Sequence, residues 1–124
     1  MKLSRTLILV ASMALSAIAG QASAQTKDGS PVIEVVTLKL KDGVTATQFW
    51  PIDQEIQTKY ISKRTGFISR ESAPGADHTW LVIVHWRSVA DADASMKSFS
   101  TAPAAAKFMS MIVPDSMVMT RYGW

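Results

Sequence analysis

His78 and His85 are the two histidines of the chain, and imidazole is the side chain best suited to exchange protons near neutral pH. They are seven residues apart in HTWLVIVHWR, a β-like segment, so they point to opposite faces and predict no joint metal site. His85 lies among apolar residues, where burial favours the neutral form that accepts a proton, and it is the candidate general base. The alternative is a core or interface histidine, whereas His78 is expected to be solvated.

Arg70 and Asp53 are the charged candidates for catalysis. Arg70 and Glu71 alternate along a predicted strand, and an inward-pointing Arg70 would hold an anionic group of a substrate. The competing expectation is that they form cross-strand ion pairs on the sheet surface. Asp53 lies near the edge of an apolar helix face, where its early position favours an interaction with the helix dipole. A carboxylate at the rim of a pocket is the functional alternative for Asp53.

Aromatic and thioether side chains supply the candidate substrate-binding residues, which are Trp50, Trp86, Met117 and Met119. Trp86 is expected to pack under the second helical region, and Trp50 to line a cavity or a dimer contact. Met117 and Met119 share one face of a predicted strand, so their soft sulfur atoms are a further candidate site for Cu(I). Methionine is also a common core residue. No cofactor-binding or metal-binding motif is present, and neither a cofactor nor a metal is predicted.

The hydrophobic pattern predicts a βαββαβ order of elements. The predicted strands cover 31–41, 67–72, 78–87 and 116–124, and the predicted helices cover 47–63, a segment capped by Ser88, and 104–111 after Pro103. This order is typical of a ferredoxin-like α+β fold, with an antiparallel four-stranded sheet and helices on one face.

The start of the first helix carries conflicting signals. Thr45 and Gln48 have the spacing of a capping box, with Thr47 as a competing cap. Pro51 then removes a backbone hydrogen bond within the helix. We expect a helix that is distorted near its start or that effectively begins at Pro51.

Apolar residues also point away from the predicted helices. Val35, Leu81 and Ile83 are candidates for the uncovered face of the sheet, and the third strand is apolar on both sides. Pairing two sheets face to face would remove this surface from water. The sequence therefore predicts a homodimer joined through the sheets.

The first 24 residues have the pattern of a secretory signal peptide. A basic start at Lys2 and Arg5 precedes an apolar run and the small-residue triplet Ala22–Ala24. Cleavage after Ala24 would leave a short arm over 25–30, a single domain over 31–124, and a periplasmic or secreted protein. The apolar run is too short for a convincing membrane span, so no membrane contact is expected after cleavage.

Composition narrows the function classes further. The chain has 124 residues, of which 48% are hydrophobic, and it has no cysteine, which excludes a cysteine nucleophile and thiolate metal sites. Beyond residue 24 there remain 11 basic and 10 acidic residues, so no concentrated basic face for nucleic acid is expected.

The sequence resembles the antibiotic biosynthesis monooxygenase-like families of the dimeric α/β-barrel superfamily. The resemblance is carried by the order of elements, by TGFISR at 65–70, and by VIVHWRS at 82–88 running into an alanine-rich helix. It covers 31–124 and implies a dimeric α/β barrel, with cofactor-free oxygenation among the activities of the superfamily.

Haem-degrading members of that superfamily are marked by an asparagine on the first strand, a tryptophan, and a histidine in the second helical region. In this chain the asparagine position falls near Val36, and the histidine position is taken by Ala104 or Ala105. The resemblance therefore does not imply haem degradation.

Two function classes follow from these observations. The first is a binding protein that holds a small apolar or aromatic molecule between sheet and helices, without chemistry of its own. The alternative is a cofactor-independent monooxygenase acting on a small hydroxylated aromatic. A cavity into which His85 or Arg70 points would favour chemistry, and a packed interior would favour a structural role.

Overall fold

The computed structural model describes residues 29–124, and the predicted signal peptide and most of the predicted arm lie outside these residues. The elements are β1 (Val32–Lys39), α3 (Ala46–Lys59), β2 (Phe67–Pro74), β3 (Thr79–Trp86), α4 (Val89–Ser98), α5 (Pro103–Ser110) and β4 (Val118–Gly123), with short 3₁₀ turns at Ile61–Lys63 and Phe99–Thr101. The predicted βαββαβ order is confirmed, with Pro103 at the start of α5.

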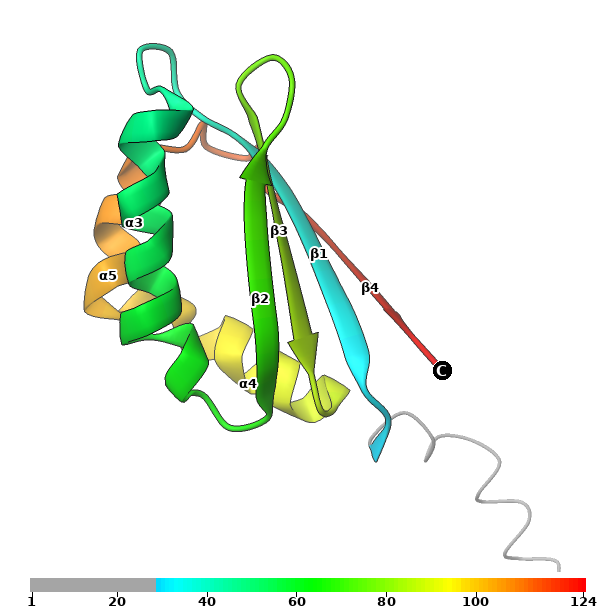
Figure 1. Ribbon diagram of the computed structural model, residues 1–124. Coiled ribbons are helices and arrows are strands. Elements are labelled where there is room, and N and C mark those ends of the chain that lie inside the picture. The colour runs from blue at the N-terminus through cyan, green and yellow to red at the C-terminus, as the bar shows by residue number, and fades with distance from the viewer. Residues whose placement is uncertain (1–28) are drawn as a thin grey trace, which may run out of the picture.

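The four strands form one antiparallel sheet in the order β2-β3-β1-β4. Figure 1 shows α3 and α5 side by side on one face of the sheet, with α4 near one end, while the other face carries no helix. The predicted ferredoxin-like α+β fold is confirmed. Within the described part of the chain, no helix combines the length and the apolar character needed to cross a membrane.

The core lies between the sheet and the helices. Alternate residues of β3 point toward the helices and are at most 5% exposed, namely Trp80, Val82, Val84 and Trp86. The ring of Phe49 on α3 lies 5.0 Å from the ring of Trp80 and 5.0 Å from that of Phe108 on α5. These aromatic contacts join both helices to the central strand, because large rings bury the most apolar area.

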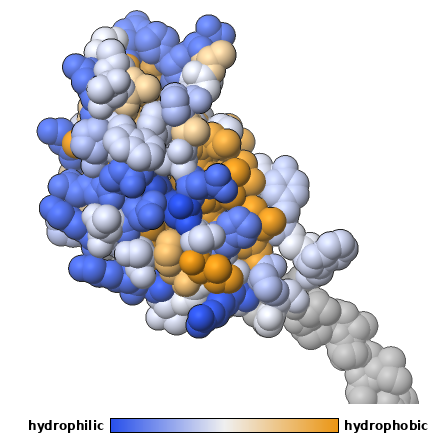
Figure 2. Space-filling view, in the orientation of Figure 1, coloured by the Kyte–Doolittle hydropathy of each residue, from blue (hydrophilic) through white to orange (hydrophobic). Residues whose placement is uncertain are grey.

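The opposite face of the sheet is apolar and uncovered by the described chain. The strand register places Val35, Ile83 and Leu81 on this outer face, as predicted, together with Ile33 and Val118. Ile33 is 39% exposed and Val118 is 59% exposed. Figure 2 shows apolar surface gathered over the strands on the side away from the helices. The described residues of one chain therefore leave the outer side of β3 without a covering layer.

The first helix begins at Ala46 and is continuous through Pro51, so the alternative in which it begins at Pro51 is wrong. Thr45 caps it through the predicted capping box: its hydroxyl accepts from the Gln48 amide at 3.1 Å, and its amide donates to the Gln48 side chain at 3.0 Å. Pro51 lies on the exposed side, where water can solvate the carbonyl of Thr47 that loses its helical partner. The predicted last turn of this helix is the 3₁₀ segment Ile61–Lys63.

Strand β2 is longer than predicted, because it takes in Ala73 and Pro74 beyond the predicted end at residue 72. Pro74 pairs with Trp80 at the edge of the sheet, and an edge strand tolerates a residue that cannot donate a backbone hydrogen bond. The turn into β3 contains Asp77 and His78, both with positive φ. His78 is exposed, as expected.

Candidate functional site

Asp53 on α3 is fully buried at 0% exposure and accepts hydrogen bonds from several side chains. Arg70 on β2 donates twice, from Nη2 to Oδ1 at 2.7 Å and from Nη1 to Oδ2 at 3.0 Å. Ser72 donates its hydroxyl at 2.5 Å, and the indole of Trp80 donates at 3.2 Å. The carboxylate is therefore held on several sides by a guanidinium, a hydroxyl and an indole.

This network corrects two expectations from the sequence. Arg70 does not form a cross-strand pair on the sheet surface, because β2 turns it toward α3 and leaves its side chain only 2% exposed. Asp53 does not act mainly on the helix dipole, because its carboxylate is aimed at the sheet, where Arg70 meets it. Periodicity placed Asp53 near the edge of an apolar helix face and left open whether Arg70 points inward or lies on the sheet surface. The packing of α3 on β2 decided both orientations.

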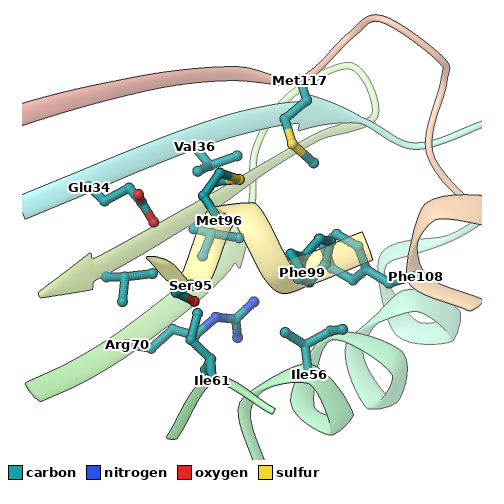
Figure 3. A pocket seen from close by; sticks show the side chains of 12 residues that line it. Glu34, Val36, Ile56, Ile61, Arg70, Ser95, Met96, Phe99, Phe108 and Met117 are labelled. Atoms are coloured by element: carbon teal, nitrogen blue, oxygen red, sulfur yellow. The ribbon is translucent and has the colours of Figure 1, made fainter. Parts of the chain in front are cut away.

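A cavity of about 60 Å³ lies beside this network, between the sheet and the helices. Its walls are mostly apolar, and they are formed by Val36, Ile56, Ile61, Val82, Val84, Met96, Phe99, Phe108 and Met117. Three polar residues complete the lining: Glu34, Arg70 and Ser95. Figure 3 shows the Arg70 guanidinium and the Glu34 carboxylate reaching toward the pocket from two different strands.

Glu34 is a second buried carboxylate, 3% exposed, at the β1 wall of the cavity. Its oxygens accept from the Trp86 indole at 3.4 Å and from Arg121 Nε and Nη2 at 3.0 and 2.9 Å. Arg121 also pairs with Asp93 on α4. Burial opposes the charged form of Arg121, but the hydrogen bonds to Asp93 and Glu34 outweigh it and raise the pKa of Arg121. Glu34 is thus held as an ion pair.

Glu34 was not among the predicted site residues, although the sequence contains a signal for it. The apolar alternation at Val36 and Leu38 extends back to position 34, which puts an acidic residue on the inward face of β1. A carboxylate at such a position needs a buried cationic partner. That partner, Arg121, lies 87 residues away, on β4.

His85 lies on the outer face of the sheet, opposite Ile33 on β1 and Ser69 on β2. It is half-buried and does not line the cavity, which opens on the other side of β3. Of the three candidate catalytic residues, the structure brings Arg70 and Asp53 together and leaves His85 apart. That His85 acts as a base stays a prediction. Within one chain, His85 has no access to this cavity.

The candidate substrate-binding residues are also distributed over several places. Met117 borders the cavity, and Trp86 is fully buried beneath it as the donor to Glu34. Met119 is 38% exposed on the edge strand, and Trp50 is 47% exposed in a shallow hollow beside Trp80. Of these four residues, only Met117 lines the cavity.

The charged groups of the cavity are suited to binding and orientation. Asp53 and Glu34 are both engaged by arginines, so neither is a free carboxylate base. In residues 29–124, no three histidine, aspartate or glutamate side chains gather in a way that could hold a metal ion. An apolar enclosure with a few oriented polar groups is the usual form of a small-molecule site.

Comparisons with known proteins address the fold. No family model and no curated protein matches the sequence. Among solved structures, SnoaB, a cofactor-independent oxygenase from Streptomyces nogalater, superposes with a TM-score of 0.61 at 10% identity, covering 75% of this chain and 91% of that chain. A candidate antibiotic biosynthesis monooxygenase from Caulobacter crescentus CB15 has a TM-score of 0.61 at 14% identity, covering 79% and 92%.

A third solved structure, the Mycobacterium tuberculosis protein Rv0793, has a TM-score of 0.54 at 14% identity, covering 75% of this chain and 93% of that chain. The superposed region covers nearly the whole length of each of these three neighbours, so the similarity concerns the complete domain. The resemblance seen in the sequence is thus confirmed at the level of the fold: the chain has the ferredoxin-like fold of antibiotic biosynthesis monooxygenase-like proteins.

Proposed function

We propose that the protein binds a small, mainly apolar molecule in the cavity between the sheet and the helices. The observation that carries this proposal is the cavity itself, a partly open apolar pocket bordered by Glu34, Arg70 and Ser95. A core built for stability alone would gain by filling this space, because each missing contact costs dispersion and transfer energy.

The size of the cavity limits what it takes in this conformation. An apolar cavity of about 150 Å³ in a protein core holds benzene, whereas the cavity here is about 60 Å³. It suits a ligand of a few heavy atoms. A larger aromatic requires Met96 and Met117 to swing aside, which these unbranched side chains do readily.

We further propose that the protein acts as an exported homodimer. Export is supported by the signal-peptide pattern of residues 1–24, and dimerisation by the uncovered apolar face that contains Val35, Leu81 and Ile83. Burying apolar area is worth about 25 cal/mol per Å², so pairing two such faces would stabilise both chains.

Xenon binding tests the cavity, because xenon is small, apolar and independent of hydrogen bonding. The variant Val36→Ile adds one methylene group at the cavity wall, and the control Val35→Ile adds it on the outer face of the same strand. We expect xenon to shift the methyl signals of Val82, Val84 and Ile56 saturably in the wild type and in Val35→Ile. In Val36→Ile the same shifts need higher xenon pressure. Absence of saturable shifts in the wild type would refute the proposal.

A cofactor-independent oxygenase is the second candidate, supported by the shared fold with SnoaB. In such a reaction the substrate supplies the electrons: a hydroxylated aromatic and O₂ give a quinone and water, with one oxygen atom entering the ring. The apolar walls would suit the ring of a small phenol. Oxygen uptake with small hydroxylated aromatics tests this candidate, and a rate equal to that without protein would exclude it for those compounds.

A further inference from the structure

The cavity wall contains two methionines. Met96 on α4 and Met117, which precedes β4, both line the cavity. Figure 3 shows them together on one side of the pocket, with Ile56 and Ile61 on the other side. Met96 is 36% exposed, whereas Met117 is half-buried. Met96 is therefore part of the cavity wall and of the protein surface at once.

The thioether of methionine is a site of oxidation by peroxides. The sulfur atom Sδ donates an electron pair to one peroxide oxygen, the O–O bond breaks, an S=O bond forms, and the other oxygen leaves as water, or as an alcohol from an alkyl peroxide. The sulfur is thereby oxidised by two electrons and the peroxide is reduced by two. Methionine sulfoxide is polar, and methionine sulfoxide reductases convert it back to methionine. The chain has seven methionines and no cysteine, so thioethers carry all of its sulfur chemistry.

A sulfoxide at position 96 is incompatible with an apolar cavity wall. Its oxygen needs a hydrogen-bond donor, and most of the residues that line the cavity are apolar. Because Met96 also lies at the surface, the oxidised side chain satisfies this oxygen by turning to the solvent or by drawing water into the cavity. In either case an apolar ligand loses its contact with the side chain of Met96.

The other exposed methionines provide a comparison within the same protein. Met109 on α5 is 44% exposed and Met119 on β4 is 38% exposed, so a peroxide reaches both as readily as it reaches Met96. Neither of them lines the cavity. Among residues 29–124, Met96 is the only methionine that is both exposed and part of the cavity wall.

We infer that Met96 is an oxidation site that regulates the cavity: a peroxide converts it to the sulfoxide, which lowers the affinity of the cavity for apolar ligands, and reduction restores that affinity. This inference rests on the binding function proposed above and adds a means of regulating the same site. The ligand is then held under reducing conditions and released when peroxide is present.

Xenon binding before and after oxidation tests this inference. The wild type, Met96→Leu and the double variant Met109→Leu/Met119→Leu are treated with hydrogen peroxide, and peptide mass spectrometry gives the extent of oxidation at each methionine. Leucine keeps the apolar character and nearly the volume of methionine but cannot form a sulfoxide. Each protein is compared with itself, because Met96→Leu alters the cavity wall and with it the starting affinity. The readout is the xenon dependence of the methyl signals of Val82 and Ile56.

We expect oxidation to lower the xenon affinity about fourfold in the wild type and in Met109→Leu/Met119→Leu, as for one buried methylene group lost from contact. Treatment with methionine sulfoxide reductases specific for each of the two sulfoxide epimers should restore the affinity. Met96→Leu should keep its own affinity after peroxide treatment, although Met109 and Met119 are oxidised in it.

The failures of the two proposals are distinguishable. A wild type whose Met96 is oxidised but which binds xenon as before would overturn the inference and leave the cavity-binding function standing. Loss of affinity in oxidised Met96→Leu would also overturn it, because another methionine, such as Met117, would then be the sensitive one. A Met96 that stays reduced while Met109 and Met119 are oxidised would have the same consequence. If the unmodified wild type shows no saturable xenon shifts, both proposals fall.

Discussion

Asp53 on α3 and Arg70 on β2 form a bidentate ion pair whose side chains are 0% and 2% exposed. The pair ties the first helix to the edge strand β2, and Ser72 and Trp80 add hydrogen bonds to the same carboxylate. Because Arg70 also lines the cavity, this pair sets the position of one polar residue of the cavity wall. The stability of the fold and the shape of the proposed binding site thus depend on the same two residues.

Breaking this pair should be strongly destabilising. We expect Asp53→Asn to lower the free energy of unfolding by about 3–5 kcal/mol, because it leaves the buried guanidinium of Arg70 without a countercharge. Urea denaturation followed by tryptophan fluorescence measures the change.

Two further variants serve as controls for that measurement. Glu55→Gln removes an exposed ion pair with Lys59 on the same helix and should cost less than about 0.5 kcal/mol. The double variant Asp53→Leu/Arg70→Met should recover most of the loss, because apolar replacements remove both charges together. An Asp53→Asn protein as stable as the wild type would show that the buried pair does not stabilise the fold.

The outer face of the sheet should be a dimer interface. We expect light scattering to give a mass near that of two chains for the protein without its first 24 residues, and that of one chain for Ile83→Asp. Ile83 lies at the centre of the apolar outer face, where a buried charge without a partner is unfavourable. Ala94→Asp, an exposed position on α4, is the matched control and should remain dimeric. A wild type that is monomeric at all concentrations tested would contradict this prediction.

His85 should influence assembly and not the cavity. It lies on the outer face beside Ile33, across the sheet from the cavity-lining residues. We expect His85→Gln to leave xenon binding unchanged while altering the concentration dependence of dimerisation. If His85→Gln instead abolished turnover of a substrate, His85 would be the base that the sequence suggested, and the catalytic site would lie at the outer face.

Export should remove the first 24 residues. The triplet Ala22–Ala24 provides the small residues that a signal peptidase recognises, so we expect Gln25 at the new N-terminus. Intact-mass measurement of protein recovered from the cell envelope or the medium checks this. Recovery there of a chain that still begins at Met1 would contradict the prediction.

The sequence by itself determined the secondary structure and the fold class. Local signals were sufficient: the capping box at Thr45, the break at Pro103, and the continuous apolar run of β3 each acted on neighbouring residues. The period of two along each strand placed Val35, Leu81 and Ile83 on the outer face correctly. These features depend on steric and hydrogen-bonding preferences within a few residues, which the sequence displays directly.

Only the tertiary structure decided the site. Asp53 and Arg70 are 17 residues apart and on different elements, and Glu34 meets Arg121 across 87 residues. Whether a charged side chain at a face boundary turns outward or inward depends on the rotation of one element against another. That rotation is set by the combined packing of many side chains, such as Phe49 against Trp80 and Phe108. No local pattern contains this information, so the buried ion pairs and the cavity beside them became visible only in three dimensions.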